Sequence, residues 1–238
     1  MVDSPTPTGT DVDGHARDRE AEVPAAEDVP EPRSRRERQR RELIDELCAE
    51  AARQLAVGGA GSVTWRGLAR AVGMSPASLY TYFDSLDALF TELILRTYAS
   101  LAAATRAGVE HFADPADRML AGIHAYRHWA LTHRAEFNLI FTDQLPGYTA
   151  EPGGATVDAQ VAVFEPLIEA ARQFDADGSP TAMLGVWGMF HGLVSLEVNH
   201  HLDWLDAAPQ FDLHVRNALE EMGFPSPSTD VAAVFAVD

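Results

Sequence analysis

The sequence lacks lysine, has a single cysteine and contains no long hydrophobic run among its 238 residues. Cys48 allows no internal disulfide, and its helical spacing from apolar neighbours predicts a buried thiol rather than a redox switch. No apolar run approaches the roughly 18 residues that span a bilayer, and the first residues are acidic where a signal peptide is basic and then apolar. We therefore expect a cytoplasmic, globular protein.

Catalytic signatures are also missing. The chain contains no HExxH string, phosphate-binding loop, serine-centred elbow or CxxC pair, so we expect neither enzymatic activity nor a cofactor. Two pairs, His124 with His128 and Glu197 with His201, lie one helical turn apart, a spacing that metal ligands use. Such pairs are frequent by chance, so no metal site is predicted and metal responsiveness stays an alternative.

The net charge of −18 is unevenly distributed. Residues 1–32 hold nine acids and two arginines, residues 33–98 hold eight acids and ten arginines, and residues 99–238 hold nineteen acids and six arginines. Because DNA binding requires cations that face phosphates, only the middle segment is suited to it. Arginine, the only cationic residue besides histidine, can contact phosphate and guanine through two hydrogen bonds at once.

Proline, glycine and capping residues divide the chain. Residues 1–32 are rich in proline and acids and nearly free of large apolar side chains, which predicts a disordered acidic arm. A helix with an apolar stripe from Leu43 to Leu55 follows, ending at Gly58. No later segment alternates like a strand, and helices are predicted over residues 100–112, 116–141, 157–174, 181–202 and 212–222. The predicted fold class is all-α.

Residues 64–83 carry the signals of a helix-turn-helix. Thr64 caps a short helix that Gly73 ends, and Ser75 caps a second one that has Pro76 in its first position and continues to Phe83. A further helix starts near Ser85. Two short helices joined by a glycine-containing turn place the second where it can enter the major groove of DNA.

The string TWRGLARAVGMSPASLYTYFDSLDAL, from Thr64 to Leu89, resembles the signature of the TetR family of transcriptional regulators. The resemblance implies a DNA-binding domain over residues 33–98 that includes the start of a connecting helix, and a helical regulatory and dimerisation domain over residues 99–238. It also implies a homodimer that reads a palindromic operator in double-stranded DNA. An activator with the same fold remains an alternative to a repressor.

Leu79 and Phe83 of the second helix should face the core, which leaves its polar side chains outward. Arg66 is the side chain that we expect to read a base, and the two tyrosines either bind phosphates or only border the core. The predicted DNA contacts are Arg36, Arg40, Thr64, Trp65, Arg66, Ser75, Pro76, Ala77, Ser78, Tyr80, Thr81 and Tyr82.

One position departs from the family pattern. Many similar proteins have a phosphate-binding lysine in the first turn of the helix after the motif, where this chain has Leu86. The arginines between Arg33 and Arg41 could compensate as a flexible basic arm that follows the DNA backbone. The alternative is that they only form a solvated charged segment.

The C-terminal half is similar to the regulatory domain of one TetR subgroup, which has a Trp-x-x-x-His-Gly element. The matching strings are YRHWALTHRAEFNLIF, from Tyr126, and WGMFHGLVSLE, from Trp187. The resemblance implies a four-helix dimer interface built from residues 157–174 and 181–202. A stripe of small residues on the second of these helices would allow close approach of a partner, unless it serves packing within one subunit. These residues are Gly185, Gly188, Gly192 and Ser195.

A pocket for a small-molecule effector is expected between these two matching helices, because helical bundles place such sites in their cores. Its aromatic character suggests a hydrophobic or aromatic ligand that releases a repressor from its operator. Core packing is an equally good explanation for each candidate residue. The candidates are Tyr126, Trp129, Phe137, Phe141, Met183, Trp187 and His191.

Overall fold

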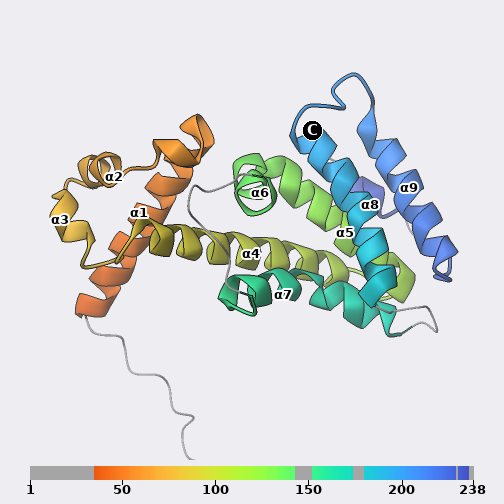
Figure 1. The fold of residues 1–238 in the computed structure, drawn as a ribbon. Helices are drawn as coiled ribbons and strands as arrows, with labels where there is room; N and C mark the ends of the chain where they lie inside the picture. The colour runs from red at the N-terminus through yellow and green to blue at the C-terminus, as the bar shows by residue number, and fades with distance from the viewer. Residues whose placement is uncertain (1–34, 143–151, 174–179, 229, 236–238) are drawn as a thin grey trace, which may run out of the picture.

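The structure, a computed structural model, describes residues 35–142, 152–173, 180–228 and 230–235. The predicted acidic arm of residues 1–32, and Arg33 with it, lies outside these ranges. The described residues form helices and turns and contain no strand, which confirms the predicted all-α class (Figure 1). None of the described helices is long and apolar enough to cross a membrane.

Four helices build the N-terminal part, where α1 (Arg35–Gly58), α2 (Trp65–Ala71) and α3 (Pro76–Leu79) pack around the beginning of α4 (Leu86–Glu110) (Figure 1). A short 3-10 helix, Ala60–Ser62, joins α1 to α2. The predicted caps are present: Thr64, Ser75 and Ser85 each accept a hydrogen bond from the backbone N–H three residues later. Local capping chemistry therefore fixes where these helices begin.

Two predicted helix limits in this part are wrong. The helix after Ser75 ends at Leu79 rather than Phe83, and tight turns bonded to the carbonyls of Ser78 and Leu79 continue it. The separate helix predicted over residues 100–112 is the second half of α4, which runs without a break to Glu110. Because α4 packs against both α5 and α7 along its length, tertiary contacts support a helix longer than its local signals indicated.

The helix predicted over residues 116–141 is two helices, α5 (Pro115–Thr132) and α6 (Arg134–Phe141). His133 leaves the helical conformation at φ −130° and ψ 49°, and its ring stacks on Trp129 at 5.0 Å. The break has a packing reason. After it, α6 reaches α1 and α4, whereas α5 lies against α4 and α7, and one straight helix could not do both.

Three helices complete the body: α7 (Ala155–Ala171), α8 (Pro180–Val198) and α9 (Ala207–Glu221). Helices are confirmed at the three predicted places, over 157–174, 181–202 and 212–222, but α8 ends four residues earlier than predicted and α9 begins five residues earlier. Helix α7 lies against α4 and α5, whereas α8 and α9 pair with each other and with α5 (Figure 1). A last 3-10 helix, Ala232–Phe235, packs on α5.

Buried polar side chains join α5 to α8 and α9. Arg127 bonds Glu197 through both ends of its guanidinium, with Nε 2.8 Å from Oε2, and its side chain is only 7% exposed. His124 is 3.0 Å from Asp212, which also accepts a hydrogen bond from Arg216. Burial lowers the pKa of His124, and the hydrogen bond to Asp212 opposes this only in part. An ion pair therefore joins α5 to α8, whereas the contact of α5 with α9 is a hydrogen bond between His124 and Asp212.

Candidate nucleic-acid interface and effector site

The helix-turn-helix has the geometry that the sequence predicts. Gly73 sits in the turn at φ +68°, a conformation that side-chain-bearing residues rarely adopt. Leu68 and Leu79 are fully buried and Phe83 is nearly so, which confirms the predicted inward face of the second helix. The opposite face is therefore left to the polar side chains of α2 and α3.

Aromatic and cationic contacts brace this pair of helices. The rings of Trp65 and Tyr80 lie 5.3 Å apart and connect the start of α2 to the end of α3. The guanidinium of Arg40 lies 5.5 Å from the ring centre of Tyr82 and connects α1 to the same turn. Tyr80 is 53% exposed, whereas Tyr82 is partly buried and packs against the core.

The structure brings the predicted DNA-contacting residues together on α1, α2 and α3. Trp65, Ser78 and Tyr82 are partly buried. None of the ion pairs between residues that the structure describes involves Arg36, Arg40 or Arg66. The remaining predicted contacts are exposed, and they are Arg36, Arg40, Thr64, Arg66, Ser75, Pro76, Ala77, Tyr80 and Thr81.

The arginine cluster is not a flexible arm over its described part. Helix α1 begins at Arg35, so the arginines that follow project from its exposed first turns and have fixed directions. Leu86, which stands where a phosphate-binding lysine is usual, is partly buried and packs against the core. Among the described residues of this cluster, a compensating phosphate contact would come from a helical face of α1.

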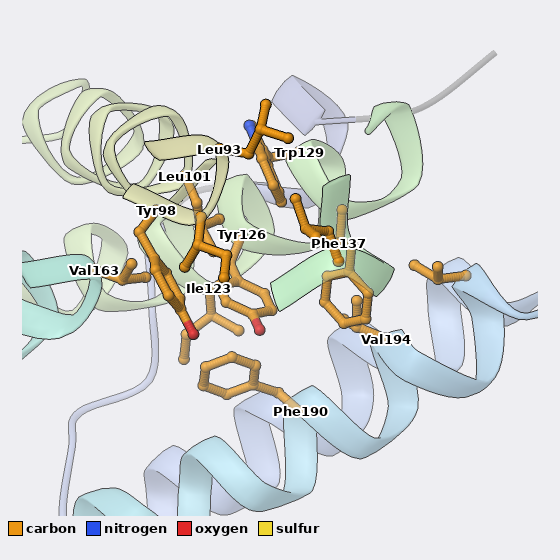
Figure 2. Close-up of a cluster of buried hydrophobic side chains, with 14 of the residues drawn as sticks. Leu93, Tyr98, Leu101, Ile123, Tyr126, Trp129, Phe137, Val163, Phe190 and Val194 are labelled. Carbon is orange, nitrogen blue, oxygen red and sulfur yellow. The ribbon is translucent and has the colours of Figure 1, made fainter. Parts of the chain in front are cut away.

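Four of the seven predicted ligand residues, Tyr126, Phe137, Phe141 and His191, form a cluster of contacting rings, and a fifth, Trp129, is buried. Tyr126 and Phe137 are fully buried, and their rings lie 6.3 Å apart beside Tyr98 and Phe190 (Figure 2). Trp129 donates its indole N–H to Ser100. Phe141 and His191 are partly buried with their rings 4.7 Å apart. These contacts are compatible with core packing, the alternative left open by the sequence, and the ligand role of these five residues stays a prediction.

A polar contact crosses this cluster. The Tyr126 hydroxyl is 2.9 Å from Nδ1 of His191. Burial raises the pKa of the Tyr126 phenol and lowers that of His191, so both groups are neutral near pH 7. Either atom can be the donor, because a neutral histidine carries its proton on Nδ1 or on Nε2.

A cavity of about 330 Å³ lies nearby, between α5, α7 and α8. Met183 and Trp187 are the two predicted ligand residues that line it. The sequence did not point to the others, which are nine apolar residues and Gln160, because they lie on three separate helices and only the fold brings them together. They are Met119, Ile123, Gln160, Val161, Phe164, Leu167, Ile168, Leu184, Val186 and Phe190.

The stripe of small residues on α8 faces away from the subunit. A Cβ atom added at Gly185, Gly188 or Gly192 would meet no other atom within 4 Å. Ser195 continues the stripe and is partly buried. Packing within one subunit, the alternative explanation of the stripe, therefore has no contact to support it among the described residues.

The two histidine pairs considered as metal ligands are engaged differently. His124 contacts Asp212, and Glu197 contacts Arg127 across helices. Over the described residues, no three histidine, cysteine, aspartate or glutamate side chains gather in a way that could hold a metal ion. The buried thiol of Cys48 has its pKa raised to about 11 by burial, which agrees with its expected core position.

Comparison with known proteins covers both halves of the chain. Residues 47–93 match the sequence model of bacterial regulatory proteins of the tetR family, and residues 119–218 match that of the tetracyclin repressor-like C-terminal domain. The two matches together cover more than half of the 238 residues. The narrower subgroup with a Trp-x-x-x-His-Gly element stays a prediction.

Individual relatives agree with these matches. The HTH-type transcriptional regulator Rv1816 of Mycobacterium tuberculosis is 36% identical over 118 residues, which are 48% of this chain and 50% of that protein. This chain thus spans about half the length of such curated relatives. Another regulator from that organism, Rv0681, is 29% identical over 160 residues, which are 64% of this chain and 69% of that protein.

A solved structure supports the whole fold. The crystal structure of the regulatory protein SCO4313 superposes with a TM-score of 0.68 at 29% identity, over 79% of this chain and 100% of that one. Its agreement extends beyond the helix-turn-helix into the helical body. The chain therefore belongs to the tetR family of bacterial regulatory proteins.

Proposed function

We propose that the protein is a dimeric, sequence-specific DNA-binding repressor that a small hydrophobic or aromatic ligand releases from a palindromic operator. The observation that carries the DNA-binding part is the exposed polar face of α2 and α3, braced by the contact of Trp65 with Tyr80. A family of transcriptional regulators is not enzymatic, in agreement with the absence of catalytic motifs.

Charge distribution supports this orientation on DNA. The segment 33–98 has more arginines than acids, whereas the rest of the chain is strongly acidic. A phosphate backbone attracts the first and repels the second, so only the end that bears α2 and α3 can approach a duplex. Arg66, exposed in the first turn of α2, is placed to reach a base edge while Tyr80 anchors a phosphate.

The dimer interface is assigned to α8, with α9 beside it. Gly185, Gly188 and Gly192 leave a smooth face open to a partner, and Leu196 of α8 and Leu213 of α9 are exposed nearby. Helix α7, which the family resemblance places in the interface, uses much of its surface against α4 and α5. The α8 and α9 pair is therefore better suited than the α7 and α8 pair.

A route from ligand to DNA runs through α6. Trp187 lines the cavity and lies 6.5 Å, between ring centres, from Phe141 at the end of α6. Helix α6 contacts α1 and α4, the helices that carry the DNA-binding part. A ligand that repositions Trp187 would therefore change the spacing between the DNA-binding domains of the two subunits. It can shift the balance between the DNA-binding and the released conformation only by the difference in its affinity for these two conformations.

The experiment that tests the function uses operators selected from random DNA by the full-length protein. Arg66→Ala should weaken binding to the selected operator by about 1–3 kcal/mol and leave binding to random DNA nearly unchanged, because a base contact carries sequence information. Arg106→Ala, an exposed arginine of the body, is the matched control and should change neither affinity. Equal losses on both DNAs would contradict the role of Arg66, and failure to select any sequence would contradict the function.

A further inference from the structure

The cavity between α5, α7 and α8 has a closed floor and an open mouth. Met119 and Ile123 of α5, Leu167 of α7 and Phe190 of α8 are each at most 1% exposed and form its buried base. Val161 and Leu184 stand at the surface, 53% and 60% exposed. A small molecule can therefore enter between α7 and α8 and be enclosed by three helices.

We propose that this cavity is the effector site and that its ligand is an uncharged, lipophilic molecule of about 10 to 15 non-hydrogen atoms, with one hydrogen-bonding group at Gln160. The ligand would thus be a neutral bicyclic aromatic compound or a medium-chain alcohol or amide. This inference rests on the function proposed above and adds the place and the chemistry of the effector.

The size follows from the volume. A cavity of about 150 Å³ in another protein holds benzene, so the 330 Å³ found here accommodates about twice that ligand. This volume lies at the lower end of the range for small-molecule sites. Large polycyclic compounds are therefore excluded unless the helices separate.

The neutrality follows from the lining. None of the described residues around the cavity is charged, and only the Gln160 amide and the Trp187 indole carry a polar side-chain group. A carboxylate or ammonium would lose its hydration without gaining a counter-charge, which costs far more free energy than a neutral polar group loses. The strongly acidic body adds a further penalty for an anion.

The position of the glycine stripe leaves this cavity to a ligand rather than to a second subunit. Successive residues of a helix are about 100° apart, so Val186, Trp187 and Phe190 lie on the side of α8 opposite to Gly185, Gly188 and Gly192. Burial agrees, because Val186 and Phe190 are buried, whereas Gly185 and Gly188 are exposed. A partner packed on the stripe would therefore not fill the cavity.

The test compares three probes of nearly equal size on the full-length protein by titration calorimetry at neutral pH. The probes are 2-naphthylmethanol, its charged analogue 2-naphthoate and the apolar 2-methylnaphthalene. We expect 2-naphthylmethanol to bind at least about tenfold more tightly than 2-naphthoate. Equal or tighter binding of 2-naphthoate would overturn the proposal.

Variants locate the site. Gln160→Leu should weaken 2-naphthylmethanol about fivefold and leave 2-methylnaphthalene unchanged, because only the alcohol uses the amide. Met183→Trp should fill the cavity and abolish binding of both, whereas the control Val57→Trp, at an exposed position of α1 outside the cavity and the assigned dimer interface, should not. Circular dichroism checks that each variant is folded. Unchanged binding of 2-naphthylmethanol to both cavity variants would overturn the site.

Two outcomes separate this inference from the proposed function. Operator binding without binding of any probe would overturn the inference and leave the DNA-binding function standing. Probe binding without operator binding would contradict the proposed DNA-binding function and leave the assigned ligand cavity standing. Probe binding that is lost at protein concentrations where the dimer forms would show that the second subunit covers the cavity, and it would also overturn the inference.

Discussion

The DNA-binding end and the body of this protein are stabilised in different ways. The end that bears α2 and α3 relies on local devices, namely serine and threonine caps, a glycine turn and one aromatic pair. The body relies on contacts between residues far apart in sequence, such as Arg127 with Glu197 and His124 with Asp212. The surface that reads DNA is therefore easy to recognise in the sequence, whereas the effector site is visible only in the fold.

The largest expected effect tests the buried charges of the body. Arg127→Ala leaves Glu197 without its partner at a site where the arginine side chain is 7% exposed, so we expect a loss of about 3–5 kcal/mol of unfolding free energy. Urea denaturation measures it. The control Arg106→Ala removes an exposed pair with Glu165 and should cost less than about 1 kcal/mol. Similar losses of unfolding free energy in the two variants would contradict the view that buried ion pairs between distant residues stabilise the body.

A second prediction concerns the two kinds of glycine in the body. Gly188→Leu should weaken the dimer by at least about 2.7 kcal/mol, or a hundredfold in Kd, because the new side chain would clash with a partner on the α8 stripe. It should leave the fold intact, since nothing lies within 4 Å of its added Cβ. Light scattering over a dilution series measures the dimer.

The matched substitution is Gly108→Ala. Its Cβ would lie 2.6 Å from Cβ of Ala125 and 3.0 Å from the backbone oxygen of Ala121, neither of which can turn away, so we expect lower stability without an effect at the dimer interface. A destabilised monomer in Gly188→Leu would show that the stripe packs inside the subunit and would contradict the assigned interface.

A smaller effect is expected at the DNA-binding end. Ser75→Ala removes the hydrogen bond to the backbone N–H of Ser78 and should cost about 1 kcal/mol of stability. Because α3 has only four helical residues, operator affinity should fall as well. Denaturation and operator binding are measured together. Ser75→Asp, which keeps a capping side chain, should retain most of the stability. A similar loss of unfolding free energy in both variants would contradict the capping role of Ser75.

The smallest effect is a pH dependence that resides in the body. Burial lowers the folded pKa of His124, which faces Asp212, Arg127 and Arg216, below its usual value of 6.5. As the pH falls below that value, the unfolded chain takes up a proton that the folded chain does not, so stability decreases. The contribution of His124 to the free energy of unfolding is therefore complete at pH values above the pKa of the unfolded chain. It is lost as the pH falls towards the lower pKa of the folded protein.

His124→Gln should flatten the fall in unfolding free energy between neutral and mildly acidic pH. Part of the slope should remain, because burial also lowers the pKa of His191. Denaturation at a series of pH values gives the slope, and the double variant with His191→Asn should be flatter still. A slope unchanged by both substitutions would place the pH dependence elsewhere in the chain.

The contrast between the regions also explains what the sequence could predict. The starts of α2, α3 and α4 follow from Thr64, Ser75 and Ser85, because a capping side chain bonds a backbone group only three residues away. The break at His133 carries no glycine or proline signal and reflects the packing of α6 against α1 and α4. The break between α5 and α6 therefore could not be predicted from the local sequence pattern.

The candidate sites divide in the same way. Arg66 and Tyr80 were identified from their place in a recognisable motif, and both are exposed in the structure. Gln160 has no such context, because its importance depends on α5 and α8 closing a cavity around it. Aromatic residues such as Phe137 drew attention through their chemistry and belong to the packed cluster.

Helix α4 has a mechanical consequence. Its 25 residues form one rod of about 37 Å, with the DNA-binding helices at one end and α5 and α7 along the rest. Tilting such a rod by about 5° at the cavity end moves its far end by about 3 Å, close to the rise of one base pair along DNA. Small adjustments around a bound molecule would thus be magnified into a mismatch with the spacing of operator half-sites.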